Sequence, residues 1–193
     1  MSKKILIILG HPNPKSFCGA LARAYHDGAQ AAGAEVRNLV LSELTFDPIL
    51  RYGYGREQEL EPGIVAAQEM ITWAEHLVFV YPIWWGTTPA LLKGFLDRTL
   101  LPGYAFKYRK GTLWWDKLLT GRSAHLIVTM DTPPWYYWLK YGRPGHRAMK
   151  QMVLEFCGIS PVRVTSIGPI KSSSDEKRSQ WLARARSIGT TMS

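Results

Sequence analysis

Apolar runs with the length of β-strands alternate with amphipathic stretches along the whole chain. The runs 5–9 and 77–80 are apolar at every position, which predicts strands buried on both faces. Ser16 as a helix cap, Gly33 just past a helix end and Pro62 in a first turn support the helix boundaries. Strands are predicted over residues 4–9, 35–41, 76–81, 123–130 and 162–167, and helices over residues 16–32, 61–74, 89–100, 145–157 and 174–188.

The order of these elements predicts the fold class. Each apolar strand is followed by a helix, which is typical of an α/β protein with a parallel sheet covered on both faces. Right-handed crossovers leave few topologies, and five strands with five helices favour a flavodoxin-like three-layer sandwich of strand order 2-1-3-4-5. No linker or repeat divides the chain, so residues 1–193 are expected to form one domain. Ligands of such sheets bind at the carboxyl ends of the strands, here the loops after Leu9, Tyr81 and Met130.

Composition adds limits to this picture. The chain has 193 residues, of which 46% are hydrophobic and 20% charged, as in a globular domain with a real core. No apolar run reaches the roughly 18 residues of a membrane span. The basic and then apolar start is shorter than a signal peptide and leads into Gly10-His11-Pro12, so we expect a cytoplasmic protein without membrane insertion. Cys18 and Cys157 have no metal-ligand spacing; we expect two reduced thiols and no metal.

The charge balance raises the question of a nucleic-acid partner, because the net charge is +9 and the pI about 9.7. The basic residues are spread along the chain, with small clusters at 107–110 and 184–186 and no recognised nucleic-acid motif. A solvated surface, or attraction for anionic cofactors and substrates, explains the charge better. No nucleic-acid partner is expected.

The loop after the first strand, residues 10–19, leads into a predicted helix. The N–H groups at a helix N-terminus and its positive dipole end can hold a phosphate, and His11, Lys15 and Ser16 add donors. The alternative is a simple turn in which Ser16 only caps the helix, although a cap and a phosphate ligand are not exclusive.

Two further loops carry aromatic side chains. Trp84 and Trp85 follow the most buried strand and could form a wall against which a flat ring stacks; the alternative places them in the core or a subunit interface. One of the two is expected there, because neighbours in an extended segment point opposite ways. Residues 135–138 follow a double proline and predict an exposed aromatic lid over a planar ligand or subunit, with a loop folded over its own core as the alternative.

Several of these segments together resemble the NAD(P)H:quinone oxidoreductases. The motifs are Tyr81-Pro82-Ile83-Trp84-Trp85, then residues 89–98 and Gly103-Tyr104-Ala105-Phe106, with weaker matches at residues 5–12, 16–17 and 44–48. This group includes the eukaryotic quinone reductases, the bacterial modulator-of-drug-activity type and the potassium-efflux ancillary flavoproteins. The resemblance covers roughly the first two thirds of the chain in order and spacing.

The resemblance implies a flavodoxin-like homodimer with FMN or FAD bound near the subunit interface. Carried over by position, the residues that meet the flavin phosphate and its neighbours are His11, Ser16, Phe17 and Cys18. Those that line the ring are Pro82, Ile83, Trp84 and Trp85, continued by Thr129, Asp131 and Thr132. Asp131 is expected to point away from the ring or to bind a ribose hydroxyl, because its charge would oppose a reduced, anionic flavin.

The sequence also departs from the family pattern. Cys18 replaces an asparagine, and residues 130–134 lack the two glycines that let the family's backbone approach the ring. Tyr137 falls where the family has its active-site tyrosine. The active-site histidine has no clean match: His146 is the nearest candidate, and Arg143 occupies nearly the aligned place. The C-terminus is shorter than in FAD-using eukaryotic members, which favours FMN.

The resemblance implies an NAD(P)H dehydrogenase that reduces quinone-like acceptors by hydride transfer through the flavin, with ping-pong kinetics and with Tyr137 and His146 as catalytic residues. NADH and NADPH both stay open as co-substrates. Two alternatives stay open as well: a flavodoxin-type electron carrier, and a regulatory flavin-binding subunit that associates peripherally with a membrane transporter. Electron carriers of this type usually have acidic docking faces, whereas this chain is basic.

Overall fold

A five-stranded parallel sheet forms the centre of the molecule. The structure is a computed structural model that describes residues 2–191. The strands are β1 (Lys4–Leu9), β2 (Glu35–Val40), β3 (His76–Pro82), β6 (Ser123–Thr129) and β7 (Val162–Ile167). They lie in the order β2-β1-β3-β6-β7, and all neighbours are parallel. Because β6 and β7 are the fourth and fifth strands of this sheet, the predicted order 2-1-3-4-5 is confirmed.

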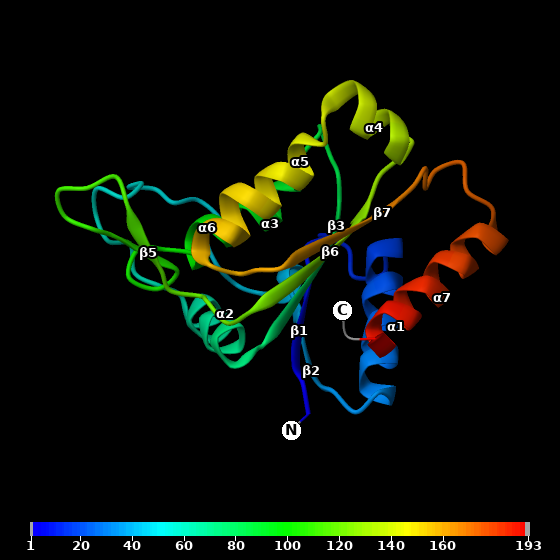
Figure 1. Ribbon diagram of the computed structural model, residues 1–193, viewed down its shortest axis with the longest axis horizontal. Coiled ribbons are helices and arrows are strands. Elements are labelled where there is room, and N and C mark those ends of the chain that lie inside the picture. The colour runs from blue at the N-terminus through cyan, green and yellow to red at the C-terminus, as the bar shows by residue number, and fades with distance from the viewer. Residues whose placement is uncertain (1, 192–193) are drawn as a thin grey trace.

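Helices cover both faces of the sheet (Figure 1). One layer contains α1 (Phe17–Ala31) and α7 (Asp175–Thr191), which lie side by side. The opposite layer contains α2 (Pro62–Trp73), α3 (Ala90–Thr99) and the helical segment that starts at Pro144. The two faces of β1 enter different cores: Leu6 and Ile8 pack under α2 and α3, whereas Ile5 and Ile7 pack under α1 and α7. This explains why β1 is apolar at nearly every position.

Two glycines let α1 and α7 approach closely. A Cβ atom on Gly28 would collide with the carbonyl oxygen of Arg186, and one on Gly189 would collide with that of Tyr25. The helix backbones therefore touch without intervening side chains. This contact fixes α1, whose N-terminus faces the carboxyl ends of the strands.

The structure differs from the prediction at the aromatic lid. Residues 134–141 form a helix, α4 (Pro134–Tyr141), rather than the expected loop. Pro134 suits the first turn, and Gly142 ends the helix in the left-handed conformation at φ 65°. The double proline that indicated a stiff loop is in fact the start of a helix.

The helix predicted over 145–157 is interrupted. It consists of α5 (Pro144–Arg147), a π-helix labelled η2 (Ala148–Leu154) and α6 (Glu155–Cys157), and ends at Gly158. A small hairpin, β4 (Phe106–Tyr108) with β5 (Trp115–Lys117), projects from the sheet and was not predicted, because three-residue strands carry too little pattern. A short 3₁₀ turn, η1 (Leu41–Glu43), follows β2.

Residues 2–191 contain neither a membrane-spanning helix nor a cluster of metal ligands. None of their helices has the length and apolar character needed to cross a membrane. In the same residues, no group of three or more His, Cys, Asp or Glu side chains is placed to hold a metal ion.

Candidate functional site

A cavity of about 200 Å³ lies at the carboxyl ends of β1, β3 and β6. This is the place that the strand order predicts for a ligand. Most of the residues predicted to bind the cofactor line it, while Trp85 and Thr132 line an adjoining cavity. The lining residues are His11, Ser16, Phe17, Cys18, Pro82, Ile83, Trp84, Thr129, Met130, Asp131 and Ile170.

The N-terminus of α1 forms one end of this cavity. The Ser16 hydroxyl caps the helix by accepting a hydrogen bond from the Gly19 N–H at 3.3 Å. Within residues 2–191, the N–H groups of Phe17 and Cys18 donate to no protein acceptor, as expected in a first turn. The cap is therefore formed, and two N–H groups still face outward at the positive end of the helix dipole. That arrangement suits a phosphate group.

Glycine is required in this turn for steric reasons. A Cβ atom on Gly19 would collide with the carbonyl oxygen of Pro14. The loop backbone thus folds tightly against the first turn of α1, and its geometry is fixed before any ligand arrives.

His11 adds a neutral donor beside the turn. Its Nδ1 accepts a hydrogen bond from the Asn13 N–H at 2.9 Å, so the neutral ring carries its proton on Nε2. Burial lowers the pKa of His11, which favours this neutral form. The ring also packs edge-on against Trp84, with centroids 5.4 Å apart.

Cys18 forms part of the inner wall. Its Sγ lies 3.2 Å from the Thr129 hydroxyl oxygen, and both side chains are buried. Burial raises the pKa of the thiol to about 11, so Cys18 stays protonated near neutral pH and is a poor nucleophile. The residue serves as a wall and a weak hydrogen-bond partner.

The tryptophan loop is a tight turn. Trp84 and Thr87 exchange two backbone hydrogen bonds, of 3.0 and 3.1 Å. Between them, Trp85 at φ 51° and Gly86 at φ 79° are both left-handed, as in a type I′ turn. A tryptophan in this conformation is strained, and such strain concentrates at functional sites. The turn projects the Trp85 side chain fully into solvent.

Neither tryptophan lies in the core of residues 2–191: Trp84 is 43% exposed, and the Trp85 side chain is fully exposed. Of the two places expected for one of them, the core or a subunit interface, only the interface stays a prediction. The positive φ of Trp85 breaks the alternation on which that expectation relied.

A second cavity of about 570 Å³ adjoins the first and shares Ile83, Met130 and Asp131 with it. The two cavities lie next to each other between the start of α1 and α4, and we refer to them together as the groove. The remaining lining residues of the second cavity are Trp85, Gly86, Thr132, Tyr137, Tyr141 and Pro144.

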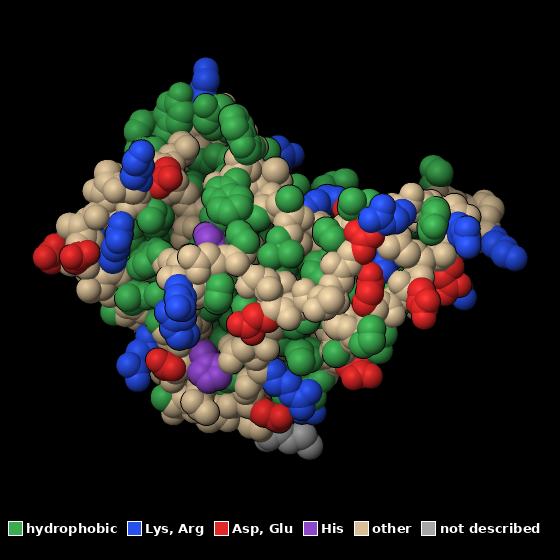
Figure 2. All heavy atoms as spheres, turned by 180° about the vertical axis from the view of Figure 1, so that it is seen from behind, with side chains coloured by type: hydrophobic (Ala, Val, Ile, Leu, Met, Phe, Trp, Pro, Cys, Tyr) green, Lys and Arg blue, Asp and Glu red, His purple; other side chains and the backbone are tan. Residues whose placement is uncertain are grey.

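Tyr137 holds the end of this groove together. Its buried hydroxyl donates to the Gly86 carbonyl at 2.8 Å and accepts from the Gly145 N–H at 2.8 Å. Burial raises the pKa of Tyr137, so the phenol stays protonated at neutral pH. Tyr137 therefore connects the tryptophan loop to α5. Its neighbours Trp135 and Trp138 are exposed on α4. Figure 2 shows hydrophobic side chains gathered at the top of the molecule, over the end at which α4 lies.

Asp131 lines both cavities, but its carboxylate is partly engaged elsewhere. Oδ1 accepts a hydrogen bond from the Lys171 N–H at 2.8 Å, in the loop after β7. Within residues 2–191, the backbone N–H groups of Asp131 and Thr132 have no protein acceptor. The loop thus offers donors to the groove although it lacks glycines.

His146 lies on the other side of Tyr137. The two rings meet edge-on with centroids 5.2 Å apart, but His146 lines neither cavity of the groove. Burial, with a contribution from the Arg143 charge, lowers the pKa of His146 to about 4, so the ring is neutral. The structure brings His146 and Arg143 together around a separate cavity.

Some lining residues were not predicted. Gly86 has a usable signal, since a glycine after two tryptophans indicates a turn. Ile170 and Pro144 have none, because they reach the groove from distant segments of the chain.

Comparison with known proteins assigns the chain to a family. Residues 3–188 match the family described as having a flavodoxin-like fold, and the chain belongs to that family. An uncharacterized NAD(P)H oxidoreductase of Haemophilus influenzae is 30% identical, covering 93% of this chain and 91% of the relative. The ribosyldihydronicotinamide dehydrogenase [quinone] of Mus musculus is 27% identical, covering 96% and 92%.

A solved structure has the same architecture. The NAD(P)H:quinone oxidoreductase of Methanothermobacter marburgensis superposes with a TM-score of 0.82 at 26% identity, covering 100% of this chain and 98% of that chain. Together these similarities confirm the resemblance seen in the sequence.

Proposed function

We propose that the groove binds a flavin nucleotide and that the protein uses it to transfer a hydride from NAD(P)H to a quinone-like acceptor. One observation carries the proposal: free N–H groups at the start of α1 and an aromatic-flanked, partly apolar cleft lie at the two ends of the groove. A flavin nucleotide has a phosphate group at one end and a planar ring at the other, so it needs both environments in one binding site. The printed names of the relatives, NAD(P)H oxidoreductase and quinone dehydrogenase, support the same reaction class.

The residues present fit the parts of a flavin. The N–H groups of Phe17 and Cys18, the Ser16 hydroxyl and the Nε2–H of His11 would hold the phosphate. Ile83, Trp84 and Trp85 would contact the ring, and the free N–H groups of Asp131 and Thr132 would donate to its polar edge. A bound flavin supplies the redox chemistry that amino-acid side chains lack.

The protein itself orients and shields the reactants in this proposal. Tyr137 holds Gly86 and Gly145 in place, so that the tryptophan turn and α5 keep the groove open. The Lys171 N–H holds Oδ1 of the Asp131 carboxylate by a hydrogen bond to the loop after β7, which restricts how the carboxylate can turn toward the ring. His146 does not reach the groove, so our proposal gives Tyr137 a positioning role and no direct catalytic role to His146.

We also propose a homodimer and favour FMN over FAD. The exposed aromatic side chains Trp85, Trp135 and Trp138 around the groove support a second subunit, since large exposed apolar patches mark interfaces. Light scattering on purified protein measures the assembly directly. A monomer at micromolar concentration would contradict the dimer without affecting the flavin proposal.

A visible spectrum of the purified protein tests the cofactor. We expect flavin absorption bands, and mass measurement of the released cofactor should identify FMN. A preparation that stays colourless after incubation with both flavin nucleotides would overturn the proposal.

Steady-state oxidation of NADH and NADPH with menadione tests the reaction. We expect turnover with parallel-line, ping-pong kinetics. Bound flavin without NAD(P)H oxidation would instead favour an electron carrier, and weak turnover with co-purification of a membrane transporter would favour a regulatory subunit.

A further inference from the structure

A basic cavity lies behind the Tyr137 wall of the groove. It has a volume of about 310 Å³ and is formed between the helical segment 143–151 and the edge strand β7. The helical segment contributes Arg143, His146, Arg147, Lys150 and Gln151, and β7 contributes two valines. No carboxylate is among these lining residues, so the cavity concentrates positive charge without internal compensation.

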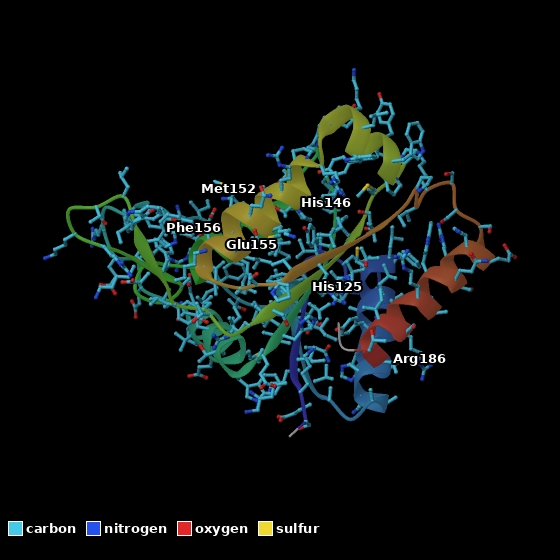
Figure 3. All side chains as sticks on the ribbon, viewed as in Figure 1. His125, His146, Met152, Glu155, Phe156 and Arg186 are labelled. Carbon is cyan, nitrogen blue, oxygen red and sulfur yellow. The ribbon has the colours of Figure 1, made fainter. Side chains whose placement is uncertain are left out.

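The charged side chains have little compensation nearby. Arg143 and Arg147 form no ion pair within residues 2–191, and Lys150 forms one long pair with Glu155 at 3.8 Å. Figure 3 shows Glu155 at the far end of the helical segment from His146. Like charges one helical turn apart repel each other weakly on an exposed helix surface, and a bound anion would relieve that repulsion.

His146 provides a second, independent observation. Its side chain is only 5% exposed, and its Nε2 is buried without a hydrogen-bond partner. A buried polar atom without a partner is rare in proteins and marks this segment as unusual. Because Nε2 has almost no accessible surface, the ring lines the cavity with its other atoms, and an anion bound there would change the environment of the imidazole.

The backbone of this segment is also unusual. Ala148–Leu154 is a π-helix, which is rare and frequently occurs at functional sites. Arg143, which begins the segment, adopts the left-handed conformation at φ 55°. Lys150 and Gln151 lie in the π-helix, while Arg143, His146 and Arg147 precede it. The irregular backbone therefore coincides with the residues that line the cavity.

We propose that this cavity binds the phosphate group of a small organic phosphate. Two guanidinium groups match the geometry of phosphate oxygens, an ammonium adds further donors, and two valines offer an apolar wall for the organic part. The volume exceeds what a simple ion needs and suits a small ligand.

The phosphate has two possible sources with the same chemistry. One is the 2′-phosphate of NADPH, because the exposed residues Arg143 and Pro144 are neighbours in the chain, and Arg143 lines this cavity while Pro144 lines the groove. The other is a free phosphorylated metabolite. The NADPH source rests on the proposed oxidoreductase function, whereas the phosphate site itself does not.

Histidine ring resonances of the ¹⁵N-labelled full-length protein test the site. Titration with inorganic phosphate, at ionic strength matched with sodium chloride, should shift the His146 ring signals saturably. Arg147→Gln should weaken phosphate binding about tenfold, the loss expected for one hydrogen bond between charged groups. Lys140→Gln, which removes an exposed cation of α4 outside the cavity, should leave binding unchanged.

Competition experiments then separate the two sources. If 2′-phospho-ADP-ribose displaces inorganic phosphate and ADP-ribose does not, the site recognises NADPH. If neither displaces it, the site takes a free organic phosphate, and the proposal still holds. Absence of a His146 shift, or an equal shift in Arg147→Gln, would overturn it. The visible spectrum of the same sample shows whether flavin is bound, so the flavin proposal is tested independently of the phosphate site.

Discussion

The two ends of the proposed flavin groove are constructed differently. The phosphate end is made of backbone: the first turn of α1, capped by Ser16 and fixed by Gly19, with a wall of buried Cys18 and Thr129. The ring end is made of side chains, with Trp85 fully exposed and α4 carrying outward tryptophans. The phosphate end is preorganised by backbone contacts, whereas the aromatic side chains at the ring end are exposed to solvent. Single backbone changes should therefore harm the first end most, and truncations at the second should be milder.

The largest effect is expected from Gly19→Ala. The new Cβ atom would collide with the Pro14 carbonyl oxygen, so the loop or the helix must shift. The N–H groups of Phe17 and Cys18 would then no longer point at the phosphate. We expect overpacking to cost about 1–3 kcal/mol of unfolding free energy, and flavin affinity to fall by about 100-fold, the effect of losing two charged hydrogen bonds. Flavin fluorescence titration and thermal denaturation measure both.

Gly63→Ala is a matched control for this change. Gly63 lies in the first turn of α2, where a Cβ atom would meet its nearest neighbour at an ordinary 3.4 Å. If the two alanine variants bind flavin equally well, the phosphate end does not depend on its backbone geometry.

Tyr137→Phe should destabilise the link between the two loops. The change leaves the Gly86 carbonyl and the Gly145 N–H without their shared partner. Losing partners for buried groups costs about 1–3 kcal/mol, which chemical denaturation can measure. The half-exposed Tyr141, for which the structure gives no hydrogen bond among the described residues, serves as the control through Tyr141→Phe. Equal stability of the two variants would argue against the positioning role of Tyr137.

Ser16→Ala separates capping from phosphate binding. Loss of the cap should cost about 1 kcal/mol of unfolding free energy, and flavin affinity should fall with it. Ser174 accepts from the Lys177 N–H at 3.3 Å at the start of α7, so Ser174→Ala removes a similar cap away from the groove. We expect that control to lower stability alone. A normal flavin affinity in Ser16→Ala would mean that the hydroxyl only caps.

Trp85→Ala should have the smallest effect on stability. The side chain is fully exposed, so unfolding free energy should change by less than about 0.5 kcal/mol. Flavin dissociation should accelerate by about three- to tenfold, as expected for loss of one aromatic contact of about 0.5–1.5 kcal/mol. Trp114→Ala, an exposed tryptophan outside the groove, should leave dissociation unchanged. Unchanged flavin retention in Trp85→Ala would count against the ring wall.

The sequence predicted the sheet well because each strand carries its own signal. Strands β1 and β3 are apolar at nearly every position, and a covered parallel sheet is the arrangement that buries them. The candidate loops after β1, β3 and β6 could be predicted for the same reason, since they directly follow strong strands, whereas the individual candidate residues came from the family resemblance.

The prediction failed where local pattern and tertiary contacts disagree. The double proline before α4 is a helix start as readily as a loop, and only packing of Tyr137 against Gly86 and Gly145 favours the helix. A π-helix has no sequence signature that separates it from an α-helix, so η2 could not be foreseen.

The sequence by itself predicted the strand order, from the alternation of apolar strands with helices and the handedness of their connections, and it predicted the groove at the strand ends together with the turn before α1 for which we propose phosphate binding. These features depend on residues close together in the chain. The direction of Trp85, the partners of the Tyr137 hydroxyl and the separation of His146 from the groove were decided only by the tertiary structure. Each depends on a backbone conformation or a contact between distant segments, and such contacts leave no trace in local sequence pattern.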